Sequence, residues 1–96
     1  AFASAKFGLR ALAQSAAREL GPKNIHVAHL IIDAGVDTAF VRDRIRAREG
    51  DAALENLDPG RLMSPESVAN AYWQLYQQPR DAWTFELEIR PFGERW

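Results

Sequence analysis

The stretch that decides the fold is AFASAKFGLRALAQSAARELG, residues 1–21. Its apolar side chains recur every three or four residues, which is the spacing of one face of an α-helix. These apolar positions are Phe2, Ala5, Leu9, Leu12, Ala16 and Leu20. Alanine, the best helix former, is abundant, and β-branched residues are absent. Gly21 and Pro22 follow the last apolar position and predict that the helix ends there.

Two side chains at the start of this helix carry most of the functional argument. Lys6 lies four residues after Phe2, so the two are expected to be neighbours on one side of the helix. Ala1 is a poor N-cap, and no capping residue precedes Phe2. We therefore expect that the sequence starts inside a helix of a longer protein.

Composition bounds the class of protein. A chain of 96 residues, with 47% hydrophobic and 26% charged residues, suits one small globular domain. A formal net charge of −1 argues against general binding of nucleic acid or of anionic membranes. The chain has no cysteine, which excludes disulfides and thiolate chemistry and allows the cytoplasmic location that we expect. No apolar run approaches the ~20 residues that a membrane helix needs.

Residues 25–32, IHVAHLII, predict a buried strand of a parallel sheet, because they are β-branched and almost continuously apolar. His26 and His29 should then point to opposite faces, so they could not chelate one metal ion together. No metal site is predicted. The loop that follows, residues 33–38, lies at the carboxyl end of this strand, where open α/β sheets bind ligands.

The rest of the chain predicts short helices, a longer helix and a final strand. Residues 39–56 alternate arginines with acids, which predicts one or two short helices with a salt-bridged surface. Ser64-Pro65-Glu66 predicts a helix start, and Pro79 its end. The expected buried stripe of that helix is Val68, Ala71, Tyr72 and Leu75, with Trp73 and Tyr76 beside it.

Residues 83–90 alternate strictly between apolar and polar, which predicts an edge strand with one apolar face. The aromatic side chains of the tail, residues 92–96, are expected to pack against another surface and not to remain free in solvent. Two strands joined through a helix make a βαβ unit, so the strands should be parallel. An isolated two-stranded sheet is marginal, so we expect either further strands in a missing part or an oligomer.

Taken in order, several motifs resemble the C-terminal part of the short-chain dehydrogenase/reductase family. They are Phe2-Ala3-Ser4-Ala5-Lys6, Ala17-Arg18-Glu19-Leu20-Gly21-Pro22 with the strand after it, Val36-Asp37-Thr38, and Ser64-Pro65-Glu66-Ser67-Val68-Ala69. The resemblance covers nearly the whole chain. It implies an α/β fold, the C-terminal portion of a Rossmann-like doubly wound domain. Residues 1–96 would form a single partial domain.

The resemblance also implies roles for particular residues. The family's long helix begins with Tyr-x-x-x-Lys, in which the Tyr exchanges a proton with the substrate and the Lys lowers the pKa of that Tyr and binds the nicotinamide ribose. Lys6 matches the Lys, but Phe2 stands at the Tyr position and has no proton to give. The family's catalytic Ser and its Gly-rich dinucleotide fingerprint are absent from this chain. Val36 and Thr38 match the loop that holds the nicotinamide, although Asp33 and Ala34 replace the usual Pro-Gly.

These matches imply a piece of an NAD- or NADP-dependent oxidoreductase. Residues 39–57 would be its substrate-covering lid, and Lys6, Val36 and Thr38 its cofactor ligands. The chain alone is expected to bind no cofactor and to be inactive, so whether it is itself an enzyme stays open. By the same resemblance it would form a homo-oligomer through the long helix, residues 2–20, and the last strand and tail, residues 83–96.

Two alternatives remain. One is a non-catalytic relative or oligomerisation module, because Phe2 replaces the acid. The other is a helix-rich binding domain, against which the net charge and the interleaved acids argue.

Overall fold

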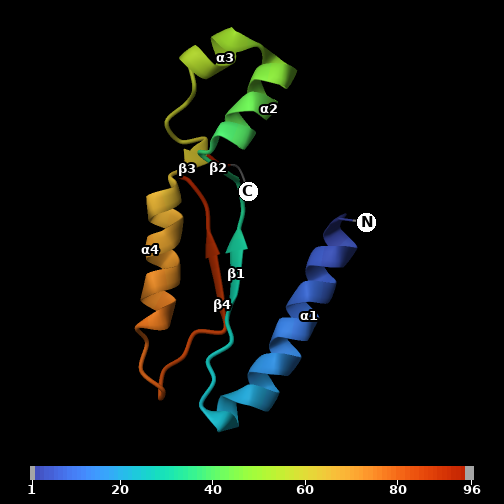
Figure 1. The fold of residues 1–96 in the computed structure, drawn as a ribbon, viewed down its shortest axis with the longest axis vertical. Coiled ribbons are helices and arrows are strands. Elements are labelled where there is room, and N and C mark those ends of the chain that lie inside the picture. The colour runs from blue at the N-terminus through green and yellow to red at the C-terminus, as the bar shows by residue number, and fades with distance from the viewer. Residues whose placement is uncertain (1, 95–96) are drawn as a thin grey trace. The chain divides into compact units, whose positions relative to one another are not determined.

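The computed structural model describes residues 2–94, and its element order is mixed helix and strand (Figure 1). The elements are α1 (Phe2–Leu20), the 3₁₀ turn η1 (Gly21–Lys23), β1 (His29–Ile32), β2 (Gly35–Val36), α2 (Ala39–Glu49), α3 (Asp51–Glu55), β3 (Leu62–Met63), α4 (Pro65–Tyr76) and β4 (Glu86–Ile89).

The long helix α1 forms where the sequence predicts it and ends as predicted. Gly21 and Pro22 begin the tighter turn η1, and Asn24 adopts the left-handed conformation with φ 67°. The Asn24 N–H donates to the carbonyl of Gly21 at 2.9 Å, which closes the turn. No described residue of α1 is buried, and Phe2 and Leu12 are 78% and 68% exposed. Of the predicted apolar face, Ala16 and Leu20 are half-buried, and the positions before them are left exposed by the described part of this chain.

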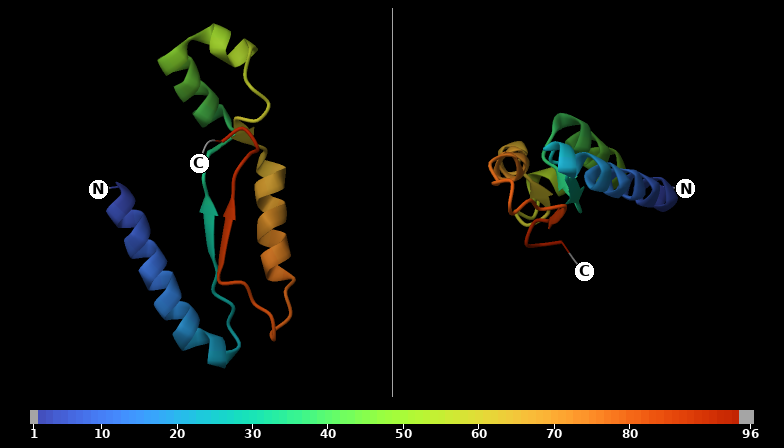
Figure 2. Two further views of the ribbon diagram at one scale, coloured as in Figure 1. Left: turned by 180° about the vertical axis from the view of Figure 1, so that it is seen from behind. Right: turned by 90° about the horizontal axis from the view of Figure 1, so that it is seen from below.

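β1 and β4 pair in parallel, as predicted. The N–H of His29 donates to the carbonyl of Phe85 at 2.6 Å, and the N–H of Asp33 donates to that of Ile89 at 3.0 Å. Both residue numbers rise together, so the strands run the same way, as the arrows in Figure 2 also show.

β1 is shorter and less buried than predicted. Residues 25–28 form no strand: the Ile25 N–H bonds back to the Leu20 carbonyl at 3.2 Å, and it is the ring of His26, at 2.8 Å, that contacts the Thr84 carbonyl. The four residues of β1 are only half-buried. Among residues 2–94, β1 has a neighbouring strand, β4, on one side only. The expectation of a buried strand over residues 25–32 was therefore wrong in both length and burial.

A second, two-residue strand pair was not predicted. β2 pairs in parallel with β3, with Gly35 opposite Leu62 and Val36 opposite Met63. The Asp37 N–H extends the pair by donating to the Met63 carbonyl at 2.7 Å. Residues 33–38 were expected to be a loop throughout, which is wrong at Gly35 and Val36. Two residues are too few to carry a strand period, so the sequence gives no signal for this pair.

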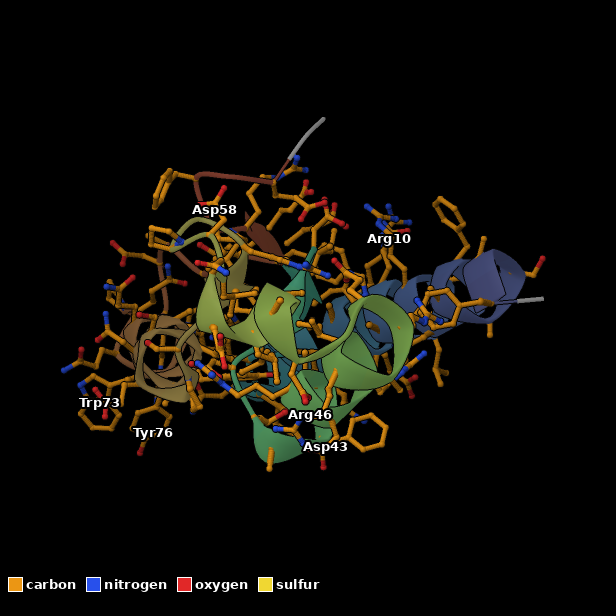
Figure 3. The ribbon with its side chains drawn as sticks, turned by 90° about the horizontal axis from the view of Figure 1, so that it is seen from above. Arg10, Asp43, Arg46, Asp58, Trp73 and Tyr76 are labelled. Atoms are coloured by element: carbon orange, nitrogen blue, oxygen red, sulfur yellow. The ribbon has the colours of Figure 1, made fainter. Side chains whose placement is uncertain are left out.

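Helix α4 begins as predicted and buries part of its predicted stripe. The Ser64 hydroxyl accepts from the Ser67 N–H at 3.1 Å, which is an N-cap bond. Ala71 and Leu75 are buried, but Tyr72 is 55% exposed, so its assignment to the buried stripe was wrong. Tyr72 lies ~100° around the helix from Ala71, which places it beside the stripe and not on it. Trp73 and Tyr76 stack with ring centroids 5.4 Å apart and remain exposed (Figure 3).

The final strand confirms the predicted alternation. Glu86 and Glu88 are exposed, whereas Leu87 and Ile89 are half-buried. The strand covers Glu86–Ile89, which is the second half of the predicted segment.

The described residues group into two compact units. The first contains residues 2–31 and 73–88, and the second contains residues 32–72 and 89–94. The assignment of residues 1–96 to a single partial domain stays a prediction.

In the second unit the tail meets the loop before β3 at two glycines. The Gly93 N–H donates to the Gly60 carbonyl at 3.0 Å. A Cβ at Gly93 would lie 2.5 Å from the Gly60 oxygen, and one at Gly60 would lie 2.9 Å from Gly93. The Phe92 ring is 86% exposed, so the expected docking of that aromatic is not seen, and Trp96 lies outside the described residues.

This contact predicts the effect of adding a methyl group. Gly60→Ala and Gly93→Ala should each lower the free energy of unfolding by about 1–3 kcal/mol, since two backbones must separate to admit the Cβ. Gly8→Ala is the matched control, because its Cβ meets nothing within 4 Å and alanine favours a helix interior by about 1 kcal/mol. Urea unfolding of the three variants measures the differences. Equal stability of Gly60→Ala and Gly8→Ala would contradict the tight contact.

Candidate functional site

The Lys6 and Phe2 side chains meet on the first turns of α1. The Lys6 Nζ lies 5.4 Å from the centroid of the Phe2 ring, within the range of a cation–π contact. Both residues are exposed. The neighbourhood predicted from their spacing of four is confirmed, and a ring face, not a hydroxyl, lies beside the ammonium.

Arg10 continues this side of α1 by one more turn and reaches β4. Its Nε and Nη2 donate to the two carboxylate oxygens of Glu86 at 2.8 and 3.0 Å, a bidentate pair. The hydrogen bond from Arg10 is the main cause that lowers the pKa of Glu86 below its ordinary value. His29 Nδ1 lies 3.4 Å from the same carboxylate, and the Arg10 guanidinium lies 5.6 Å from the centroid of the Phe85 ring.

Sequence reasoning missed this cluster. Glu86 was expected on the polar face of its strand, and Arg10 on the long helix, but nothing local pairs residues so distant in the sequence. The four residue spacing from Lys6 to Arg10 is the one signal that could have directed attention to Arg10.

Thr38 caps helix α2 in the second unit. Its Oγ1 accepts from the Val41 N–H at 3.2 Å, and the side chain is exposed. A hydroxyl that accepts a hydrogen bond still carries its own proton to donate. Val36, the other predicted ligand of this loop, lies in β2 and is half-buried. Lys6 belongs to the first unit, and Val36 and Thr38 to the second.

The entrance to α2 is held by a second bidentate ion pair. Arg42 Nε and Nη2 donate to the carboxylate oxygens of Asp37 at 2.5 and 3.1 Å. The hydrogen bond from Arg42 lowers the pKa of Asp37 below its ordinary value. Asp37 therefore stays ionised next to Thr38 at neutral pH.

The predicted lid consists of α2 and α3, which meet at Gly50 with φ 88°. Arg46 lies 3.1 Å from Asp43 in its own helix (Figure 3) and bridges the junction by a second 3.1 Å contact, to Asp51 of α3. Glu49, the last residue of α2, accepts two hydrogen bonds from Arg61, at 3.0 and 2.5 Å, which lower the pKa of Glu49. One or two short helices with a salt-bridged surface were predicted here; two helices form, and their ion pairs confirm the salt-bridged surface.

Ile45 is the buried apolar side chain of α2. The predicted lid therefore combines one buried apolar side chain with ion pairs at the two ends of α2. Across residues 2–94, no group of three or more His, Cys, Asp or Glu side chains is arranged to hold a metal ion.

One solved structure matches the chain closely in both sequence and fold. It is the crystal structure of a short-chain dehydrogenase from Rhodopseudomonas palustris, 56% identical in sequence over 95% of this chain, with a TM-score of 0.61. The resemblance to the short-chain dehydrogenase/reductase family is confirmed. The α/β arrangement with parallel strands is accordingly part of a Rossmann-like fold.

The chain spans 29% of the length of that dehydrogenase. No protein-family model matches the sequence, and no curated protein matches it significantly. Within residues 2–94, none of the helices has the length and apolar character needed to cross a membrane.

The three bidentate pairs predict how stability depends on pH. Arg42, Arg61 and Arg10 lower the pKa of Asp37, Glu49 and Glu86 below the ordinary values of 3.8, 4.5 and 4.5. Such a carboxyl binds fewer protons in the folded than in the unfolded chain. Its stabilisation is therefore complete above the ordinary pKa and is lost as the pH falls through the lowered one.

We expect the urea midpoint of unfolding to fall as the pH is lowered through this acid range. Asp37→Asn should make that fall shallower, because one of the three contributing carboxyls is gone. Glu19→Gln, which neutralises an acid on α1, is the control and should leave the fall unchanged. A pH dependence that is the same for Asp37→Asn and for the unmodified chain would refute the stabilising role of the Asp37–Arg42 pair.

Proposed function

We propose that this chain is part of an NAD(P)-dependent short-chain oxidoreductase. It would supply residues that bind the nicotinamide end of the cofactor and the lid that covers the substrate. Such an enzyme transfers a hydride between the nicotinamide and a carbonyl or alcohol substrate. The observation that carries the proposal is the 56% identity, over 95% of the chain, to a protein described as a short-chain dehydrogenase. The chain spans 29% of the length of that protein, so the hydride-transfer activity of a complete enzyme is itself proposed.

Taken singly, the predicted ligands carry groups that suit the nicotinamide end of the cofactor. Lys6 has an exposed ammonium and would donate hydrogen bonds to the ribose hydroxyls. Thr38 has an exposed hydroxyl with a proton left to donate, and Val36 precedes it on the same short segment. When bound, the cofactor supplies or accepts the hydride.

The phosphate end of the cofactor has no comparable residues here. The glycines are scattered at positions 8, 21, 35, 50, 60 and 93 and form no Gly-rich phosphate-binding turn. The proposal therefore assigns the phosphates, and the choice between NAD and NADP, to a part of the enzyme beyond these 96 residues.

Phe2 decides how active such an enzyme would be. It occupies the position from which the family's Tyr donates a proton, and a phenyl ring has none to donate. Loss of a positioned proton donor costs about 10²–10⁴-fold in rate. A substrate with its own acid, or another donor, would be needed for efficient carbonyl reduction.

The second candidate function is a non-catalytic relative that keeps the fold for assembly. The Phe2 ring lies against the Lys6 ammonium, so this side of α1 packs as a cation–aromatic pair without an acid. Phe2, Leu9 and Leu12 expose 78%, 50% and 68% of their surface on α1. A second copy of the chain would cover this face, with β4 and the tail as a second contact. We place this protein in the cytoplasm, and the net charge of −1 gives no support for a nucleic-acid partner.

A chimera tests the catalytic proposal. Residues 1–96 would replace the aligned segment of the Rhodopseudomonas palustris dehydrogenase, which restores the part of the fold that this chain lacks. We expect the chimera to bind NADH or NADPH, measured by nicotinamide fluorescence, and Lys6→Met to weaken that binding. Phe2→Tyr should raise the rate of carbonyl reduction by about 10²–10⁴-fold. The separate 96-residue chain is the control, and calorimetry should detect no binding of either cofactor to it.

Three results of this experiment decide between the candidates. A Phe2 chimera as fast as the Phe2→Tyr chimera would show that another group donates the proton. A chimera that folds but binds neither cofactor would reject the nicotinamide role of Lys6. Cofactor binding without turnover, restored by Phe2→Tyr, would favour the non-catalytic relative.

Assembly through α1 is tested by the mass of the chain in solution. Leu9→Lys and Leu12→Lys together should convert an oligomer to a monomer, since each places a charge on the exposed apolar face. Gln14→Lys is the matched control, because position 14 lies ~160° around the helix from Leu12. Light scattering after size-exclusion chromatography measures the mass. A monomeric unmodified chain would remove the support for an assembly module.

A further inference from the structure

Buried side chains do not hold helix α1 against strand β4. No described residue of α1 is buried, and residues 2–9 are all exposed, so no packed apolar side chain orients the turns around Lys6 toward the strand. The Arg10–Glu86 pair does connect them. It joins the third turn of α1 to the first residue of β4, within the first unit.

The geometry of this pair restrains rotation as well as distance. A planar guanidinium with two parallel hydrogen bonds, at 2.8 and 3.0 Å, has one orientation toward the carboxylate. The Phe85 ring lies 5.6 Å from that guanidinium, and His29 Nδ1 approaches the carboxylate at 3.4 Å. About a third of each side chain is exposed, 34% for Arg10 and 32% for Glu86. Arg10 is therefore held by its neighbour Phe85 and by a carboxylate that His29 also contacts.

Lys6 shares this side of the helix. It precedes Arg10 by four residues, which is ~6 Å along the axis and ~40° around it. α1 runs opposite to β1 and β4, as both views in Figures 1 and 2 show. Moving from Arg10 to Lys6 therefore follows the direction in which β4 runs, toward the end of a parallel sheet at which α/β proteins bind ligands.

We propose that Arg10 and Glu86 are positioning residues for Lys6. Their bidentate pair sets the rotation of α1 about its axis and so presents the Lys6 ammonium on the strand side. This inference rests on the proposed function for the role of Lys6 in binding the ribose. The placement of Lys6 itself can be measured without any cofactor.

The composition of the chain permits a direct measurement. Lys6 and Lys23 are its lysines and it has no cysteine, so reductive ¹³C-methylation gives two lysine signals and a single added thiol takes a spin label. Glu88→Cys puts a nitroxide on the same face of β4 as Glu86, since the two are two residues apart. We expect paramagnetic broadening of the Lys6 methyl signal in the full chain, with the Lys23 signal as the internal reference.

The variants then separate positioning from general stability. Arg10→Gln and Glu86→Gln should each abolish most of the Lys6 broadening while the helical circular dichroism is retained. Arg18→Gln, the same change on the last turn of α1, should leave it unaltered. The exchanged pair, Arg10→Glu with Glu86→Arg, should restore the broadening at least in part. If the single variants lost the broadening for reasons other than the broken pair, the exchange would not restore it.

The proposal is overturned if both single variants keep the full broadening, or if the unmodified chain shows none. A single variant that unfolds is decided by the exchanged pair, because failure of that pair to restore the signal also overturns the proposal. These outcomes do not depend on nicotinamide binding. A chain with Lys6 correctly placed, in a chimera that binds no cofactor, would reject the proposed function and leave the positioning role intact.

Discussion

The parallel pairing of β1 with β4 is the constraint on which the other elements depend. Parallel neighbours cannot be joined by a tight turn, so a long crossover must connect them. The residues between Asp33 and Phe85 form that crossover, and they contain the short β2–β3 pair, the lid and helix α4. At the carboxyl end of the pair, Arg90 lies 2.9 Å from Asp33, so a charged contact adds to the backbone hydrogen bonds there.

Whether a feature could be predicted from the sequence depends on how far apart along the chain the interacting residues lie. The helices and their ends depend on local signals, such as the period of residues 2–20 and the Ser64 cap, and these were sufficient. The start of β1 depends on the His26 ring, which bonds Thr84 far along the chain, so the predicted strand was too long. The adjacency of Phe2 and Lys6 follows from helix geometry, whereas the bond between Arg10 and Glu86 requires the folded pairing of α1 with β4. The assignment of Lys6, Val36 and Thr38 to a cofactor comes from the family resemblance, and their roles stay predictions.

The predicted lid, helices α2 and α3, is stabilised differently from the β1–β4 pair. Its buried side chain is Ile45, and ion pairs at Asp37 and Glu49 hold the two ends of α2. Exposed ion pairs break and re-form at little cost, whereas apolar burial does not. Segments with few buried contacts open at low free energy, which would suit the role of lid that the family resemblance predicts for residues 39–57. Gly50, with its positive φ, separates helices α2 and α3.

The contact between Gly60 and Gly93 has a consequence for how this sequence can evolve. Two stretches of backbone cross there with no side chain between them, although the residues are far apart along the chain. A Cβ added at Gly93 would lie closest to Gly60, and one added at Gly60 would lie equally close to Gly93 and to the Phe92 ring, so each position limits which residues the other segment accepts. Drift would be free at the exposed Gly8 and constrained at this crossing, where neither glycine can be replaced until the backbone of its partner has moved.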